Sequence, residues 1–197
     1  MGKPTHIILV RHGESEGNLD HSLFRIIPDH KIKLTPRGIR QAYEAGLRLR
    51  RDIIACDERV QFFVSPYERT RQTYVAVKRA ITDGCTCQWN EEERGERIVY
   101  REEPRLREQD WGNFQHPPEL MKEIREERKR FGHFFYRLPN GESGADVYDR
   151  LSTFIDTLHR AFEKPDFPSK CVIITHGLLI RLFLTRWFHY PFDEFEA

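Results

Sequence analysis

The chain has almost no surplus charge of either sign. Its 32 Lys and Arg residues stand against 31 Asp and Glu residues, which leaves a formal net charge of +1. A chain this close to neutrality has no overall field that would draw it onto nucleic acid, so we expect no nucleic-acid partner. Affinity for anions must then come from a local cluster of side chains. Internal repeats and low-complexity stretches are also lacking.

Long hydrophobic runs are lacking as well. The longest are the strand-sized Ile7–Val10 and Cys171–Thr175, which are far too short to span a bilayer. The N-terminus shows no charged segment followed by an apolar one, as a secretory signal would. We therefore expect no membrane partner.

Cysteine is scarce, and its spacing favours neither a zinc site nor a disulfide framework. Of the four cysteines at positions 56, 85, 87 and 171, only Cys85 and Cys87 lie close in sequence, and the single residue between them matches no usual zinc spacing. We interpret all four as free thiols, which predicts a cytoplasmic protein.

The order of apolar segments predicts an α/β fold. A chain of 197 residues, 39% hydrophobic and 32% charged, suits a single domain spanning residues 1–197. Thr35 with Pro36, and Ser65 with Glu68 as a capping box, mark two helix starts. Strands are expected at 6–10, 60–64, 98–101 and 171–175, and further helices at 119–130, 147–162 and 178–188. Strands alternating with helices imply a mostly parallel sheet covered by helices on both faces.

Residues 113–140 read as an insertion over this sheet. The segment holds the charged helix 119–130, an aromatic cluster at Phe131, Phe134, Phe135 and Tyr136, and a turn at 139–141. We interpret the charge run 122–130 as a solvated face. The aromatic cluster is either a packed lid or satellite core, or it lines the leaving-group side of a substrate site.

Chemically capable side chains follow the expected strands at the points where they end. Arg11 and His12 come after the first strand, the Ser65–Arg69 turn after the second, and His176 after the last. Ligands of such sheets collect outside the carboxyl ends of the strands. Two arginines repel a metal cation but match the oxygens of a phosphate, so the sequence predicts a phosphate site without metal or other cofactor.

The motifs around these residues resemble the histidine phosphatase superfamily, in its phosphoglycerate mutase-like branch. The similarity runs through nearly the whole chain, in the order 9–15 (LVRHGES), 65–73 (SPYERTRQT), 106–108 (LRE) followed by Trp111 and Gly112, and 175–177 (THG). The resemblance implies a three-layer sandwich and an enzyme that acts on a small-molecule phosphate ester.

The same resemblance implies a role for each matching residue. His12 is expected to attack phosphorus and form a phosphohistidine, while Arg11, Arg69 and His176 hold the phosphate oxygens. Glu108 is expected to be the acid that protonates the leaving oxygen. The neighbouring acidic residues Glu102, Glu103 and Asp110 are not expected to serve as this acid.

Four small or polar residues are further candidates for substrate binding. Gly13 would allow close approach of the backbone to phosphate or a positive φ, or would simply form a tight turn. Ser15 and Asn18 either donate to phosphate or cap the following segment. Gly177 follows His176 in its motif. Of the other histidines, His21 and His116 are expected near the cleft, and those at 6, 30, 133, 159 and 189 are interpreted as structural or solvated.

The sequence leaves three functions open. After Glu108 the chain reads QDWGNFQ instead of the Arg-Tyr-Gly typical of the mutases, which favours hydrolysis of small phosphorylated metabolites over phosphoglycerate mutase-type transfer. Asp29 and His30 with Leu34 and Thr35, and Trp111 with Gly112, are similar to a subgroup of broad-range acid phosphatases. The third alternative is a non-catalytic phosphate-binding module. No pattern indicates an oligomeric state.

Overall fold

The centre of the molecule is a four-stranded parallel sheet. The computed structural model describes residues 3–85 and 97–196. Its strands are β1 (His6–Arg11), β2 (Val60–Val64), β3 (Ile98–Glu102) and β4 (Lys170–Thr175), in the order β1-β4-β2-β3, and each neighbouring pair is parallel. The expected parallel sheet is confirmed. Because β4 and β2 are central and buried along their whole length, they are near-continuous apolar runs in the sequence.

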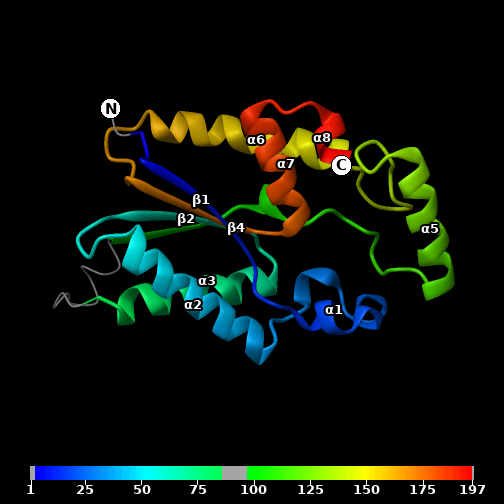
Figure 1. The fold of residues 1–197 in the computed structure, drawn as a ribbon, viewed down its shortest axis with the longest axis horizontal. Helices are drawn as coiled ribbons and strands as arrows, with labels where there is room; N and C mark the ends of the chain where they lie inside the picture. The colour runs from blue at the N-terminus through cyan, green and yellow to red at the C-terminus, as the bar shows by residue number, and fades with distance from the viewer. Residues whose placement is uncertain (1–2, 86–96, 197) are drawn as a thin grey trace.

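Helices cover both faces of this sheet (Figure 1). On one face lie α2 (Pro36–Asp52) and α3 (Glu68–Asp83), and on the other lie α6 (Gly144–Phe162), α7 (Gly177–Phe188) and α8 (Phe192–Glu196). Alternate strand residues enter the two resulting cores: Phe63 and Ile173 pack with α6 and α7, whereas Phe62 and Val172 pack with α2 and α3. The three-layer arrangement is therefore confirmed, and α8 is an element that the sequence did not reveal.

Of the two helix starts that the sequence marks by a capping pattern, one is confirmed. Thr35 accepts a hydrogen bond from the Gly38 N–H at 2.9 Å, and Pro36 occupies the first turn of α2, as expected. The expected capping box at Ser65 is wrong: α3 begins at Glu68 after Tyr67. The Ser65 hydroxyl instead lies 2.8 Å from His176 Nε2, a partner 111 residues away in sequence.

Short helices and the expected insertion gather beyond the carboxyl ends of the strands. They are α1 (Glu16–Leu19), the 3-10 turns η1 (His21–Arg25), η2 (Asp29–Lys31) and η3 (Pro104–Leu106), and α5 (Pro118–Phe131), which lies beyond that end of the sheet (Figure 1). No helix in residues 3–85 and 97–196 has the length and apolar character needed to cross a bilayer.

The aromatic cluster of the insertion is split between core and surface. Tyr136 packs with Met121 and Ile124 of α5 in a satellite cluster, which confirms the satellite-core interpretation for this residue, whereas Phe134 joins the main core beside α6. Phe131 and Phe135 are exposed.

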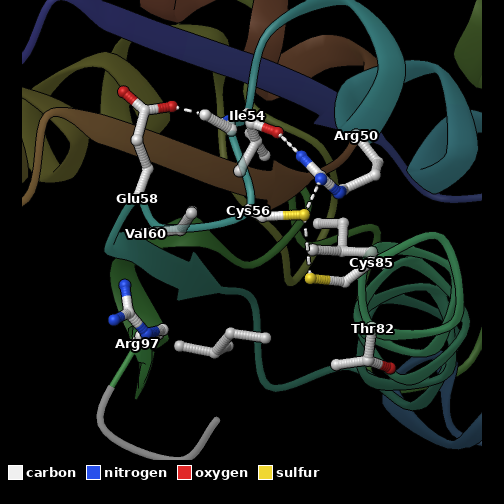
Figure 2. Close-up of a pocket in the computed structure, with 11 residues that line it drawn as sticks. Arg50, Ile54, Cys56, Glu58, Val60, Thr82, Cys85 and Arg97 are labelled. Atoms are coloured by element: carbon white, nitrogen blue, oxygen red, sulfur yellow. Dashed lines mark hydrogen bonds between the residues drawn. The ribbon is translucent and has the colours of Figure 1, made fainter. Parts of the chain in front are cut away.

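A small pocket lies at the opposite, amino-terminal edge of the sheet, where Val60 and Ile98 begin β2 and β3 (Figure 2). There the sulfur of Cys85 lies 2.9 Å from that of Cys56, which also contacts the Arg50 guanidinium. Cys171, in contrast, is a thiol enclosed in β4, and burial raises its pKa to about 12. The interpretation of Cys87 concerns a position outside the described residues.

Phe154 tests whether the core beside α6 carries the stability of the fold. Its side chain is fully buried, and its ring meets that of Phe63 edge-on at 5.4 Å. We expect Phe154→Ala to lower the free energy of unfolding by about 3–5 kcal/mol, because a cavity replaces these contacts. Phe188→Ala removes a ring that is 56% exposed and is the matched control. Equal effects of the two substitutions in urea unfolding would contradict this account.

Candidate functional site

The parallel register brings three chain segments together at one edge of the sheet. Arg11 pairs with Thr175 in the β1–β4 ladder, and Val64 pairs with Ile174 in the β2–β4 ladder. The ladders continue one residue further, because the His12 N–H donates to the Thr175 carbonyl and the Ser65 N–H to the Ile174 carbonyl, both at 3.0 Å. The side chains that follow β1, β2 and β4 therefore meet.

These side chains surround a cavity of about 190 Å³. Of the residues singled out from the sequence, Arg11, His12, Ser15, Asn18, His21, Arg69 and Glu108 line it, together with Phe24, Asp29, Trp111, Gln115 and Arg125. His176 does not line the cavity but contacts His12 edge-on, with 5.3 Å between the ring centres. Gly13, Gly177 and His116 are also not among the lining residues, nor is the aromatic cluster of the insertion.

His12 is held as a neutral imidazole with one nitrogen open. Its Nδ1 lies 2.7 Å from the Gly13 carbonyl oxygen, which can only accept, so Nδ1 carries the hydrogen and Nε2 keeps its lone pair. Burial, together with the positive charge of Arg69, lowers the pKa of His12 from 6.5 to about 4. Above that pH the ring combines an unprotonated Nε2 with a fixed orientation, which is the form that a nucleophile or a base requires.

His176 is completely buried and has one unused nitrogen. Its Nε2 is hydrogen-bonded to the Ser65 hydroxyl, whereas its Nδ1 has no partner within residues 3–85 and 97–196. Burial and the charge of Arg69 hold its pKa well below the usual range, so the ring is neutral. A buried polar nitrogen without a partner is costly, and a ligand that supplies an acceptor would remove that cost.

Arg11 and Arg69, together with Arg125 of α5, give the cavity its positive charge. Arg69, in the first turn of α3, is 4% exposed and directs Nη1 to Asp29, while its guanidinium lies over the Tyr67 ring. Arg11, at the end of β1, lies against Gly177, where an added Cβ would come within 3.4 Å of Arg11 Nε. A phosphate group in this cavity would meet planar donors from two different chain segments.

Glu108 has an environment that favours its protonated form. It sits on the loop after η3, and the protein packed around it raises its pKa to about 7, against the opposing effects of the Gln109 N–H and of Arg69. A carboxyl group that is still protonated at mildly acidic pH can donate a proton to a neighbouring oxygen.

The loop that carries Glu108 is fastened by side chains from three other elements. Thr175 of β4 donates to the Leu106 carbonyl at 2.7 Å, and Arg150 of α6 donates to the Glu108 carbonyl at 3.1 Å. Gln109 is fully buried and receives a hydrogen bond from Arg128 of α5 at 3.0 Å. Glu108 therefore has a fixed position although its loop belongs to no regular element.

The three neighbouring acidic residues have other partners. Glu102 pairs with Arg71 at 2.5 Å and Glu103 with Arg105 at 2.7 Å, whereas Asp110 accepts a hydrogen bond from the Gly112 N–H. None of the three lines the cavity.

Close packing against α2 explains why residue 13 is a glycine. Its φ does not lie in the positive range, and a Cβ at this position would lie 2.2 Å from the carbonyl oxygen of Gly38 in α2. The backbone that Gly13 approaches is thus that of α2. Ser15 and Asn18 line the cavity, and at the start of α1 the Ser15 N–H and hydroxyl donate to Asn18 Oδ1 at 2.9 and 3.0 Å, while their donation to phosphate stays a prediction.

Sequence reasoning missed two cationic residues of α5. Arg125 lines the cavity and Arg128 is buried against Gln109 and Trp111, so the charge run 122–130 is not simply a solvated face. The signal was present, since Met121, Ile124, Arg125 and Arg128 recur at the spacing of one helix face, which the two apolar members mark as buried. For the involvement of Asp29 the sequence carried no comparable pattern.

The sequence as a whole agrees with this geometry. The sequence model of the histidine phosphatase superfamily (branch 1) matches residues 7–197. The chain belongs to this superfamily. Among solved structures, a mycobacterial glucosyl-3-phosphoglycerate phosphatase superposes with a TM-score of 0.68 at 20% identity over 97% of this chain and 82% of its own, a likeness that concerns the fold.

Two curated relatives are similar over nearly the full chain. The phosphoglycerate mutase-like protein AT74 of Arabidopsis thaliana is 46% identical over 98% of this chain, and the broad-range acid phosphatase DET1 of Saccharomyces cerevisiae is 30% identical over 99% of it. The chain spans 61% of the length of AT74 and 82% of that of DET1.

The protonation state of His12 is directly measurable. We expect nitrogen-detected NMR of the histidine rings to show His12 with a hydrogen on Nδ1, an unprotonated Nε2, and a titration midpoint near pH 4, because burial and two arginines oppose the cation. His12→Asn identifies the signal by removing it. A midpoint at the ordinary value of 6.5 would show that the site is open to water and that the geometry described above is wrong.

Proposed function

We propose that this chain is a phosphatase that hydrolyses small phosphomonoesters through a phosphohistidine at His12, in the cytoplasm and without a metal ion. The observation that carries the proposal is the orientation of His12, whose Nδ1 is bound to the Gly13 carbonyl and whose Nε2 is free beside two arginines. The name of DET1, a broad-range acid phosphatase, supports the same reaction class. We assign the activity to one domain formed by residues 1–197.

In the first step His12 Nε2 attacks phosphorus and the bond from phosphorus to the ester oxygen breaks. Glu108 donates its proton to that oxygen, so the leaving group departs as an alcohol and Glu108 becomes a carboxylate. Arg11, Arg69 and His176 Nδ1 donate to the three phosphoryl oxygens, where charge shifts during transfer. The arginines supply the positive charge that a metal ion would otherwise provide, so the proposal needs no metal.

In the second step water attacks the phosphohistidine on the side that the alcohol has left. Glu108 takes a proton from this water as the bond from phosphorus to Nε2 breaks, and His12 returns to its neutral form. Inorganic phosphate is released, and Glu108 is again protonated. The two steps together consume one ester and one water.

Water is the proposed acceptor because the residues after Glu108 are occupied. Gln109, the first of these residues, is fully buried, donates to the Glu142 carbonyl at 2.7 Å and accepts from Arg128, so it is held within the protein and does not line the cavity. A mutase must hold the acceptor while the phosphoryl group is on histidine.

The decisive test is the behaviour of His12→Ala. We expect kcat for phosphate release to fall on the order of 10⁴-fold or more, because the nucleophile is lost. When the reaction of the unmodified protein with labelled ester is quenched, labelled phosphate that is stable to base and labile to acid should remain bound to the protein. His12→Ala should retain no label. His116→Ala, outside the cavity, is the matched control. Isomerised ester in place of free phosphate would contradict hydrolysis, and unchanged activity of His12→Ala would contradict the whole mechanism.

The two pKa shifts predict a bell-shaped pH profile. Glu108 must be protonated, so activity is present below its pKa of about 7 and is lost above it. His12 must be neutral, so activity is lost as the pH falls through about 4. We expect kcat/KM to peak between these values. Glu108→Gln should lower kcat/KM, which reports the first transfer step, by about 10²–10⁴-fold for alkyl phosphates and far less for aryl phosphates, whose leaving groups need no proton. An equal loss for both ester types would argue against Glu108 as the acid.

A further inference from the structure

Asp29 is a carboxylate inside a cavity that is otherwise suited to anions. It lies in η2, and both its side chain and its backbone face Arg69: Nη1 lies 2.7 Å from Oδ1 and 2.8 Å from the Asp29 carbonyl oxygen. The Arg69 side chain is 5% exposed and that of Asp29 is 27% exposed. An anion at this place repels the phosphate that the cavity is proposed to bind, so its presence needs a reason.

The geometry of this pair leaves half of the guanidinium available. The two contacts use the two hydrogens of Nη1, whereas Nε and Nη2 of Arg69 make no hydrogen bond within the described segments of the chain. The edge formed by Nε and Nη2 can donate hydrogen bonds to two phosphate oxygens at once. Asp29 therefore fixes the plane of Arg69 and does not block its binding edge.

The charge balance of the cavity depends on the same residue. His12 and His176 are neutral and Glu108 is protonated below about pH 7, so the cavity holds the cations Arg11, Arg69 and Arg125 against the anion Asp29. The charge of Asp29 also contributes to the raised pKa values of Tyr67 and Glu108. Charged and titratable groups face this space from every surrounding element. They are Arg11 at the end of β1, His12 directly after it, His21 from η1, Tyr67 and Arg69 at the start of α3, Glu108, Arg125 from α5, and more distantly Arg150 from α6.

We propose that Asp29 is a positioning residue that orients Arg69 and, through its charge, weakens binding of the doubly charged form of a phosphate group relative to the singly charged form. A phosphate monoester carries one negative charge below about pH 6 and two above it. Asp29 lowers the surplus positive charge of the cavity from three to two, and it repels a dianion more strongly than a monoanion. The inference rests on the proposed function. It adds that the preference of the enzyme for acidic pH comes from substrate binding as well as from the protonation of Glu108.

The test separates the charge of Asp29 from its hydrogen bonds. Asp29→Asn keeps an Oδ1 acceptor and the backbone carbonyl for Arg69, so a residue that merely tethers the loop would be replaced without effect. Asp29→Glu keeps the charge, and Asp156→Asn removes the same charge from an exposed site on α6 and is the matched control. Each change is made in Glu108→Gln protein, so that Glu108 does not titrate and no turnover is involved.

Binding of inorganic phosphate to these proteins is measured by calorimetry at about pH 5 and about pH 8, where it is mainly singly and mainly doubly charged. We expect Asp29→Asn to tighten the Kd about tenfold at the higher pH and about threefold or less at the lower, because the doubly charged ion is repelled more strongly. Asp29→Glu and Asp156→Asn should retain the parent pH dependence.

An unchanged ratio of the two Kd values in Asp29→Asn would overturn the inference and leave the proposed phosphatase standing. Weaker phosphate binding by Asp29→Asn at both pH values would likewise overturn it, since Asp29 would then serve only to hold Arg69. If phosphate binds to none of the proteins, both the inference and the proposed function fail.

Discussion

The hydrogen-bonded register of β1, β4 and β2 is the constraint on which the site depends. Each strand ends at the same level, and each is followed at once by a polar side chain: His12, His176 and Ser65. Because side chains alternate between the two faces of a strand, a slip of one residue would send His12 to the opposite face of the sheet. The buried apolar residues of β4 and β2 oppose such a slip, since it would also exchange the residues of the two cores. The packing of the core is therefore also what aligns the reactive groups.

Glu108 is positioned by a different principle, because no strand carries it. Its loop depends on polar side chains from distant segments, chiefly Thr175, Arg150 and Arg128. Buried hydrogen bonds of this kind add little net stability each, but removing one partner leaves the other unsatisfied at a cost of about 1–3 kcal/mol. The insertion helix α5 thus has a place in the site through Arg128, beyond adding surface. An acid held in this way is sensitive to changes in α5 and α6 that never touch the cavity.

Much of this arrangement could be read from the sequence, and the exceptions share a cause. The strands, the Thr35 cap and the convergence of Arg11, His12 and His176 follow from local patterns and from the rule for parallel sheets. Ser65 was misread because its hydroxyl bonds a residue 111 positions away, and a local capping rule contains no such partner. For Arg128 the apolar residues Met121 and Ile124 mark the buried face of its helix, but its partner Gln109 is brought near by folding alone.

Burial, more than the arginines, gives the site its acid and base character. The positive charge of Arg69 lowers the pKa of His12 and of Glu108 alike, so arginines alone would leave Glu108 ionised at mildly acidic pH. Burial penalises the charged form of each group, and therefore lowers the pKa of the imidazole to about 4 and raises that of the carboxyl to about 7. Only burial moves the pKa values of His12 and Glu108 apart in this direction, so that a neutral imidazole lies beside a protonated carboxyl. The negative charge of Asp29 offsets part of the influence of Arg69, so the cavity contains an arginine while the pKa of the neighbouring Glu108 stays raised.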